Sequence, residues 1–383
     1  MNPFDYRAVA AVDEALAAIA AATGEAARPD GGAKFIAGGT NLIDLMKERV
    51  MGPALLVDIN GLPLHDIAPT ANGGLGLGAL ARNEDTARHP VVRKHYPLLR
   101  AAILAGASPQ IRNMASNGGN LLQRTRCYYF YDAGVPCNKH APGSGCPATT
   151  GLARQHAILG ASPHCIATHP SDMCVALAAL EAVVQVTSAG GSRTIAIDDF
   201  HRLPGERPDI DTTLAEGELI TRIDVPPAGQ FARHCSYLKI RERASYAFAL
   251  VSVAAALDLA EDGAVRAARL ALGGVAHKPW RNREAEALLI GRRAQRASYE
   301  AAADLIVAEA RAWGGPALPD GTPGNAFKIP LARRAVVRAL EMAEGGIVTN
   351  TGEDARQAED SPLLTPEEPS TLEHAPKREE GRQ

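Results

Sequence analysis

The stretch Ala37-Gly38-Gly39-Thr40-Asn41-Leu42 decides how the first part of this chain is understood. It follows a short apolar run and precedes apolar residues at helical spacing, so it is predicted to be a turn between a strand and a helix. Two adjacent glycines let consecutive backbone N–H groups face one anion without an intervening Cβ atom. The turn therefore suits a phosphate or a diphosphate, although a plain structural turn is the commoner reason for such a pair.

A second glycine pair lies in the stretch IRNMASNGGNL at 111–121. Hydroxyl and amide side chains flank both pairs, so the two turns could together enclose an extended diphosphate from two sides. Neither turn matches the G-x-x-x-x-G-K-[ST] loop or the G-x-G-x-x-G fingerprint. An ATP site of the first type and a Rossmann-type dinucleotide site are therefore disfavoured.

These two motifs resemble the FAD-binding subunit of molybdenum hydroxylases of the xanthine dehydrogenase type. The segments HPSD at 169–172 and LGGVA at 272–276 are similar to further parts of that family, and the resemblance covers residues 1–343. It implies an α+β fold in which two subdomains of the PCMH/VAO type hold FAD between them, followed by an α+β C-terminal domain. By matching positions, it implies that the cofactor is held by Ala37, Gly38, Gly39, Thr40, Asn41, Leu42, Ser116, Gly118, Gly119, Asn120, Ser171, Asp172 and Lys239.

Two of these residues have a second interpretation. Asp172 stands at the expected start of a helix, where the helix dipole favours an acidic residue whether or not a ligand is bound. Lys239 lies in a strand that the family places near the isoalloxazine ring, but a solvent-exposed lysine is the simpler interpretation.

The order of the expected elements divides the chain into three folded parts. Residues 1–61 are predicted to form the first FAD-binding subdomain, residues 62–227 the second, and residues 228–345 the C-terminal domain. Residues 124–168 interrupt the regular pattern with Cys, Gly, Pro and Asn, so they are interpreted as an insertion in the second subdomain. Residues 346–383 are rich in polar residues and proline with few apolar ones, and they are predicted to be a disordered tail.

Apolar periodicity predicts the individual elements. It indicates an amphipathic helix within residues 1–26, a helical stretch over 91–105 and a strand over 219–225. Residues 236–259 are predicted as a strand that gives way to a helix. The last predicted helix ends at Trp313.

Four of the six cysteines fall within residues 127–165, and this clustering indicates a metal site. In a chain without a readable secretion signal, grouped cysteines suggest ligation before a disulfide framework. Their wide spacing fits neither a zinc knuckle nor a ferredoxin motif, so structural zinc and a [4Fe–4S] cluster both stay open. Cys174 and Cys235 stand apart among apolar or small residues and are predicted to be buried structural thiols. The candidate ligands are Cys127, Cys137, Cys146 and Cys165.

The residues around these cysteines resemble one branch of the family, the bacterial periplasmic aldehyde oxidoreductases, whose flavin subunit has an inserted [4Fe–4S] cluster. The similar segments are CYYFYD at 127–132, PCNK at 136–139, PGSGC at 142–146 and HCIATH at 164–169. The resemblance therefore implies a [4Fe–4S] cluster in this chain. The benzoyl-CoA-reducing branch, with enzymes like 4-hydroxybenzoyl-CoA reductase, also has a cluster in this subunit and is the alternative.

By this resemblance the chain is an electron-transfer subunit of a heterotrimer. Substrate oxidation would occur at a molybdenum cofactor in a large partner subunit. Electrons would pass through [2Fe–2S] centres of a small partner subunit to FAD on this chain, and then to an external acceptor. Two other classes stay open: a stand-alone flavoprotein oxidoreductase with substrate residues of its own, and a zinc-stabilised nucleotide-binding module without a redox role.

Composition limits the partners and the compartment. A net charge of −3 without a basic cluster argues against nucleic acid and anionic membranes as partners. No long uncharged apolar run is present, and charged residues interrupt the N-terminal segment, so neither a membrane span nor a signal peptide is predicted. The chain is expected to be soluble and cytoplasmic, or periplasmic if a partner subunit with a twin-arginine signal carries it out folded.

Overall fold

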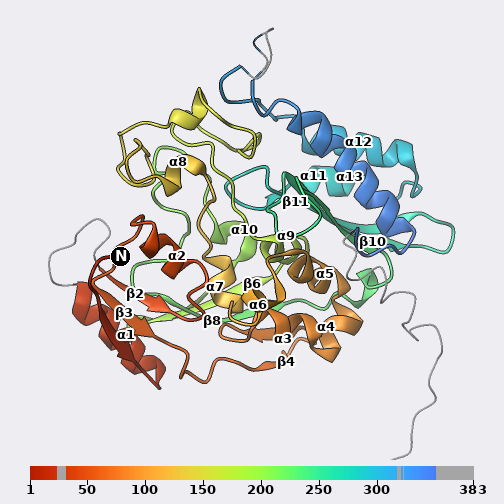
Figure 1. The fold of residues 1–383 in the computed structure, drawn as a ribbon. Helices are drawn as coiled ribbons and strands as arrows, with labels where there is room; N and C mark the ends of the chain where they lie inside the picture. Colours follow the sequence, from red (N-terminus) through yellow and green to blue (C-terminus); the bar gives the residue numbers. More distant parts are fainter. Residues whose placement is uncertain (24–31, 317–320, 322, 351–383) are drawn as a thin grey trace, which may run out of the picture.

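A computed structural model describes residues 1–23, 32–316, 321 and 323–350 of the protein (Figure 1). Within these ranges the chain forms three sheets, of three, five and four strands. The strands of each sheet are consecutive in the sequence, so the sheets follow one another along the chain. This arrangement agrees with a mixed α and β fold.

The first sheet is parallel, with strand order β1-β3-β2. Parallel neighbours need a crossover connection, and one helix supplies each crossover. The N-terminal prediction of a single helix missed β1, because its four residues are all exposed and show no apolar alternation. The elements are β1 (Asp5–Ala8), α1 (Val12–Thr23), β2 (Ala33–Ile36), α2 (Leu42–Lys47) and β3 (Leu55–Asp58).

The second sheet is antiparallel, with strand order β4-β5-β8-β6-β7. Its strands are β4 (Ile67–Pro69), β5 (Leu75–Gly78), β6 (Val183–Ser188), β7 (Gly191–Ala196) and β8 (Leu219–Val225). The helical stretch predicted over 91–105 is interrupted at Tyr96, because Pro97 begins a new helix. The helices in this part are α3 (Asn83–Arg88), α4 (Pro90–His95), α5 (Pro97–Ala105), α6 (Pro109–Arg112), α7 (Asn117–Leu121), α9 (Asp172–Ala179) and α10 (Ile197–Phe200).

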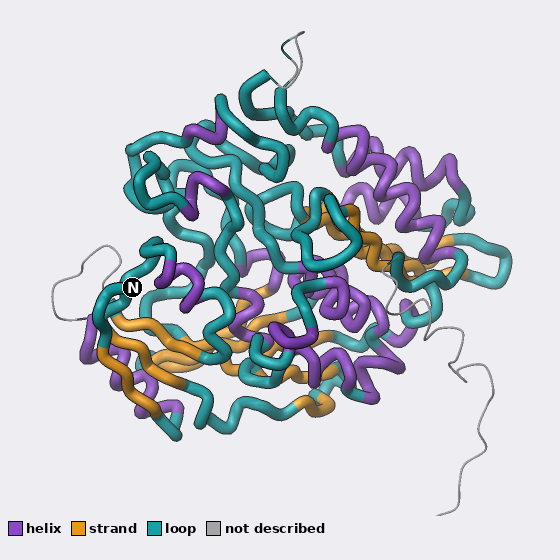
Figure 2. Tube along the Cα trace, viewed as in Figure 1, coloured by secondary structure: helices purple, strands orange, loops and turns teal. Residues whose placement is uncertain are grey.

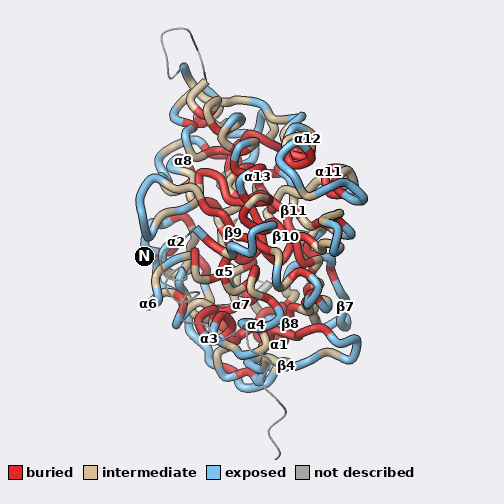
Figure 3. Tube along the Cα trace, turned by 90° about the vertical axis from the view of Figure 1, so that its right-hand side faces the viewer, coloured by how far each residue is buried: buried red, intermediate tan, exposed pale blue. Residues whose placement is uncertain are grey.

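The third sheet has helices on both faces. α5 and α9 pack against one face, and the C-terminal helices pack against the other. As a result β10 is buried along almost its whole length (Figure 3). The elements are β9 (Cys235–Ile240), β10 (Val251–Leu259), β11 (Val265–Gly273), β12 (Trp280–Arg281), α11 (Arg283–Leu289), α12 (Arg296–Ile306), α13 (Lys328–Glu344) and the short 3-10 helix η2 (Gly229–Phe231).

Two predictions for this region were wrong. Residues 236–259 form two strands rather than a strand and a helix, because a strand that is buried on both faces is a continuous apolar run, like a buried helix. Helix α13 was not predicted at all, although it is the longest helix of the described chain.

The insertion at 124–168 consists mostly of loops, as Figure 2 shows. It contains only α8 (Tyr128–Tyr131) and the 3-10 helix η1 (Pro147–Thr149). Its end is nevertheless attached to the C-terminal core: Ile158 and Leu159 are buried there, and their N–H groups donate to the carbonyl oxygen of Val275 at 2.9 and 3.0 Å. The insertion therefore has some hydrophobic support besides any metal.

The predicted tail at 346–383 lies mostly outside the described residues. Its beginning is placed alongside β9, where the carbonyl oxygen of Val348 accepts from the N–H of Tyr237 at 2.7 Å. The Asn350 side chain also bonds the backbone of Lys239 through both its oxygen and its nitrogen. Among the described helices, none is both long enough and apolar enough for a membrane span.

Candidate functional site

A cavity of about 1680 Å³ lies between the first two sheets and the end of β9. This exceeds the ~300–1,000 Å³ of ordinary small-molecule pockets, so the cavity is large enough for an extended ligand. Twelve of the predicted cofactor residues line it, which are Ala37, Gly38, Gly39, Thr40, Asn41, Leu42, Ser116, Gly119, Asn120, Ser171, Asp172 and Lys239.

The first glycine turn offers unused hydrogen-bond donors to this cavity. Within the described chain, no hydrogen-bond acceptor is found for the backbone N–H groups of residues 38–42. Gly39 has a φ of +71°, a conformation that L side chains rarely adopt and that turns successive N–H groups toward one side. The buried Nδ2 atom of Asn41 also lacks a partner, while its Oδ1 accepts from the N–H of Arg124 at 2.9 Å. These free donors fit the diphosphate of a dinucleotide.

In the second glycine turn the N–H groups of both glycines already have acceptors within the protein, so this turn lines the cavity mainly with side chains. Ser116 caps α7, and its Oγ accepts from the N–H of Gly119 at 3.2 Å. Gly118 is absent from the cavity lining, and its N–H donates to the carbonyl oxygen of Ala79 at 2.8 Å. Gly118 thus allows close packing against Ala79, where a Cβ atom would lie 3.1 Å from the alanine side chain.

The two turns touch each other at Gly38. A Cβ atom there would lie 1.9 Å from the carbonyl oxygen of Met114, which is backbone and therefore unable to rotate away. The first glycine pair thus serves two purposes: Gly39 takes the left-handed conformation, and Gly38 lets the second turn come close.

A buried amide network holds the second turn, and it was not predicted. Asn83 accepts from Asn120 Nδ2 at 2.7 Å and donates to Asn117 Oδ1 at 3.0 Å. Asn117 also donates to Thr86 Oγ1 at 2.9 Å. Buried amides are costly unless they are paired, so this network fixes the position that Asn120 presents to the cavity.

Asp172 and Lys239 form a buried ion pair that joins α9 to β9. The Lys239 ammonium donates to Asp172 Oδ2 at 2.8 Å and to the carbonyl oxygen of Ala105 at 2.9 Å. Asp172 Oδ1 accepts from the Tyr237 hydroxyl at 2.7 Å, and burial raises the pKa of Tyr237 well above its ordinary value. Ser171 caps α9, accepting from the N–H of Cys174 at 3.0 Å. The interpretation of Lys239 as a surface lysine is wrong, since only 3% of it is exposed.

Replacing Lys239 by methionine is expected to lower the free energy of unfolding by about 3–5 kcal/mol, because the Asp172 carboxylate would stay buried without its partner. Denaturant unfolding of the isolated chain measures this. Lys94→Met, at an exposed lysine, is the matched control. Adding Asp172→Asn to Lys239→Met should restore part of the loss, and a double variant less stable than the single one would contradict this account.

Arg126 is a cavity residue that the sequence did not reveal. No carboxylate of the described chain lies within 4.0 Å of its guanidinium, which stacks 5.0 Å from the centre of the Phe248 ring. Arg126 lines the cavity and directly precedes the first clustered cysteine. Its position between two sites depends on tertiary structure, so no local pattern distinguishes it from other arginines.

The four clustered cysteines line one small pocket. Cys127, Cys137, Cys146 and Cys165 are all free thiols. No three of their sulfur atoms lie within 4.8 Å of one another in the described chain. Four thiolates can ligate either structural zinc or a four-iron cluster.

The pKa values of these thiols are shifted in different directions. Burial raises the pKa of Cys127 to about 12, and a hydrogen bond from Cys165 lowers the pKa of Cys146 to about 6. Metal ligation requires thiolates. Binding of a metal centre at this pocket should therefore release protons, at least from the buried thiols.

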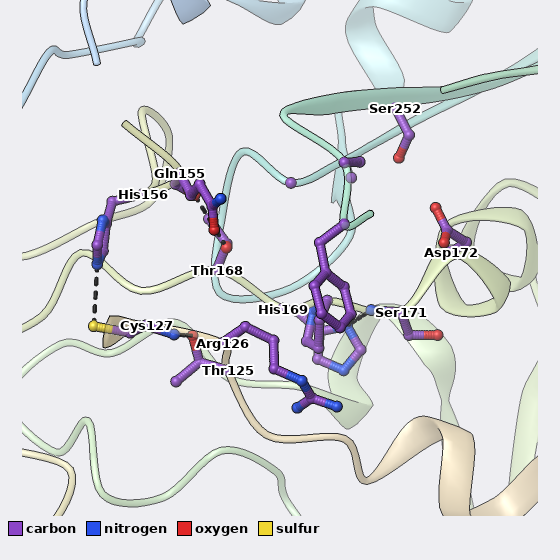
Figure 4. Close-up of a pocket in the computed structure, with 15 residues that line it drawn as sticks. Thr125, Arg126, Cys127, Gln155, His156, Thr168, His169, Ser171, Asp172 and Ser252 are labelled. Atoms are coloured by element: carbon purple, nitrogen blue, oxygen red, sulfur yellow. Dashed lines mark hydrogen bonds between the residues drawn. The ribbon is translucent and has the colours of Figure 1, made fainter. Parts of the chain in front are cut away.

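A third cavity shares lining residues with both sites (Figure 4). It is lined by Arg126, Ser171 and Asp172, which also line the large cavity, and by Cys127 and His156, which also line the cysteine pocket. The cofactor cavity and the cysteine pocket therefore adjoin through the dipeptide Arg126-Cys127.

Outside both sites, Cys174 and Cys235 are 0% and 1% exposed and belong to the core between the second and third sheets. This confirms the prediction that both thiols are buried.

Comparison with known proteins covers nearly the whole described chain. Residues 2–228 match the family model of the FAD binding domain in molybdopterin dehydrogenase, and residues 236–343 match that of the CO dehydrogenase flavoprotein C-terminal domain. The chain is 51% identical over 313 residues to the aldehyde oxidoreductase FAD-binding subunit PaoB of Escherichia coli, spanning 82% of this chain and 92% of that protein. It is 31% identical over 258 residues to the glyceraldehyde dehydrogenase medium chain of Sulfolobus acidocaldarius, spanning 67% and 73%.

A solved structure shows the same fold. A chain of the carbon monoxide dehydrogenase from Hydrogenophaga pseudoflava aligns with a TM-score of 0.66 at 27% identity, covering 90% of this chain and 98% of that one. Together with the two family matches, this shows that the chain belongs to the FAD-binding medium subunits of the molybdenum hydroxylases and is a subunit of an oxidoreductase of that type.

Proposed function

We propose that this chain carries FAD in the large cavity and a [4Fe–4S] cluster on its four clustered cysteines, as the electron-transfer subunit of a molybdenum-dependent aldehyde oxidoreductase. The observation that carries the proposal is that the two sites adjoin through Arg126 and Cys127. FAD supplies the exchange between one-electron and two-electron carriers, and the protein supplies position and electrostatics.

For FAD, the first glycine turn supplies the diphosphate site. The free N–H groups of residues 38–42 would donate to phosphate oxygens, with the Nδ2 group of Asn41 as a side-chain donor. The second turn would close the other side of the diphosphate with Ser116, Gly119 and Asn120.

Lys239 and Asp172 would contribute by fixing the wall of the cavity, since each already has a partner. Arg126, like Lys34 and Arg243, is a lining cation without a carboxylate partner among the described residues. Of these three it alone also lines the third cavity beside the cysteine pocket, so it is suited to an electron-rich part of the cofactor.

For the cluster, the support is the convergence of the four cysteines on one pocket. The match to oxidoreductase subunits counts against the nucleotide-binding module without a redox role. No feature of the described chain favours a 4-hydroxybenzoyl-CoA reductase-like enzyme.

The aldehyde assignment and the partners rest on the relatives. The 51% identical protein of E. coli is an aldehyde oxidoreductase subunit, and the S. acidocaldarius relative is the medium chain of a glyceraldehyde dehydrogenase. By analogy, a large subunit with the molybdenum cofactor would oxidise the substrate, and a small [2Fe–2S] subunit would deliver electrons to FAD on this chain.

Expressed alone, the chain is expected to contain FAD but to oxidise no aldehyde with an artificial acceptor, because substrate oxidation belongs to the large partner subunit. The same assay on the chain purified with its partner subunits should show turnover, which gives the matched control. Robust aldehyde oxidation by the isolated chain would instead identify a stand-alone flavoprotein oxidoreductase.

A further inference from the structure

Two buried histidines face the cysteine pocket from different parts of the chain. His156 Nε2 lies 3.0 Å from Cys127 Sγ, as Figure 4 shows, and His277 Nε2 lies 3.3 Å from Cys165 Sγ. Their exposed fractions are 2% and 8%. Both rings are therefore shielded from solvent beside the cysteines.

The hydrogen-bonding state of both rings follows from their surroundings. A neutral imidazole carries one N–H group, on either Nδ1 or Nε2. Both Nδ1 atoms are buried and have no partner in the described chain, so a proton on Nδ1 would be a buried donor without an acceptor. With the proton on Nε2, each ring instead donates an N–H···S hydrogen bond to a cysteine sulfur.

Both histidines are held in place by the C-terminal part of the chain. The carbonyl oxygen of His156 accepts from the buried ammonium of Lys328 at 2.8 Å. His277 lies four residues after the end of β11. The carbonyl oxygen of its neighbour Ala276 accepts from the N–H of His169 at 2.9 Å. The cysteines belong to the insertion, whereas His277 and Lys328 belong to the C-terminal part. The two donors are therefore fixed by structure that does not depend on the insertion alone.

We propose that His156 and His277 donate N–H···S hydrogen bonds to two ligands of the cluster and thereby raise its reduction potential. This proposal rests on the proposed [4Fe–4S] cluster. Reduction adds negative charge that spreads onto the thiolate sulfurs, and a hydrogen bond to a more negative acceptor is stronger. The donors therefore stabilise the reduced form more than the oxidised form, and hydrogen bonds to sulfur are among the factors that set such potentials. His156 and His277 are positioning residues, since the cysteines bind the iron.

The test is a redox titration of the cluster, followed by electron paramagnetic resonance, in the chain with its bound cofactors. His156→Leu and His277→Leu remove the donor but keep an apolar side chain that excludes water. Each should shift the reduction equilibrium about tenfold toward the oxidised form, a fall of about 59 mV for one electron. Gln at either position places an amide N–H near the position of Nε2 and should recover part of the potential.

His164→Leu is the matched control. His164 lines the same pocket but is exposed, and its ring makes no hydrogen bond to a cysteine in the described structure. Its replacement should leave the potential unchanged. If both leucine variants keep their iron and show an unchanged reduction potential, the proposal is overturned. It is also overturned if the potential falls as far in the glutamine variants as in the leucine variants. A chain that contains FAD but no iron would overturn the cluster and this proposal together. Failure of the cluster can therefore be told apart from failure of the histidine hydrogen bonds alone.

A second measurement uses the unmodified chain, so it does not require that a variant folds. With 15N-labelled histidine, pulsed electron paramagnetic resonance of the reduced cluster should show weak coupling to histidine nitrogen, as expected across a hydrogen bond. Strong coupling would mean that a histidine binds iron directly, and no coupling would mean that neither ring contacts the ligands. Either result would overturn the proposal.

Discussion

Replacing Gly38 by alanine is expected to yield protein that folds but retains little FAD. The added Cβ atom would lie 1.9 Å from the carbonyl oxygen of Met114, so the two glycine turns would have to separate. The hydrogen-bond donors of the two turns would then no longer be held in the arrangement that binds the diphosphate, so FAD would bind less tightly. We expect FAD affinity to fall at least about tenfold, which corresponds to ~1.4 kcal/mol. Flavin absorbance per protein after gel filtration, and titration of the apoprotein with FAD, measure the loss.

Gly190→Ala is the matched control for this change. Gly190 lies in the turn between β6 and β7, away from the cavity, and a Cβ atom there would be 3.6 Å from its nearest neighbour. This variant should keep full flavin. Full flavin occupancy in Gly38→Ala with an unchanged affinity would refute the placement of the diphosphate at the first turn.

Replacing Cys146 by serine is expected to remove the cluster and loosen the insertion. The segment around it is short of regular structure, and its turns are held by side chains such as Asn138, whose Oδ1 accepts from the N–H groups of Gly143 and Gly145 at 3.0 and 2.9 Å. When a metal site does not exist in the unfolded chain, its binding free energy contributes to folding. Iron and acid-labile sulfide should fall from about four each per chain to near zero. Limited proteolysis should then cut within 124–168.

Cys174→Ala and Cys235→Ala are the controls, because both thiols lie in the core between the second and third sheets. Both variants should keep the iron of the cluster, even where their free energy of unfolding falls. If Cys235 proves necessary for iron while Cys165 does not, the ligand set is wrong.

The sequence was informative where a local pattern determines the structure. The glycine turn at 37–42 predicted a strand, a turn and a helix, and the structure has β2, the turn and α2 there. Strand β8 was predicted at its observed bounds, since it is flanked by turn residues and alternates. The clustering of four cysteines likewise predicted that they converge, and they line one pocket.

Features that depend on tertiary contacts could not be predicted in the same way. The burial of Lys239 results from packing against α5 and α9, which are distant in the sequence. Arg126, Asn83 and His277 acquire their positions from neighbours far along the chain. Helix α13 is different, because its apolar residues do recur at helical spacing and this signal was present. The recurring positions are Ala332, Ala335, Val336, Ala339, Leu340 and Ala343.

Cofactor analysis of the purified, unmodified chain tests the central claim most directly. Extracted flavin, iron, acid-labile sulfide and zinc would be measured per chain on one preparation. The account predicts about one FAD with about four iron and four sulfide, and no stoichiometric zinc. About one zinc without iron, or a chain free of flavin, would contradict it.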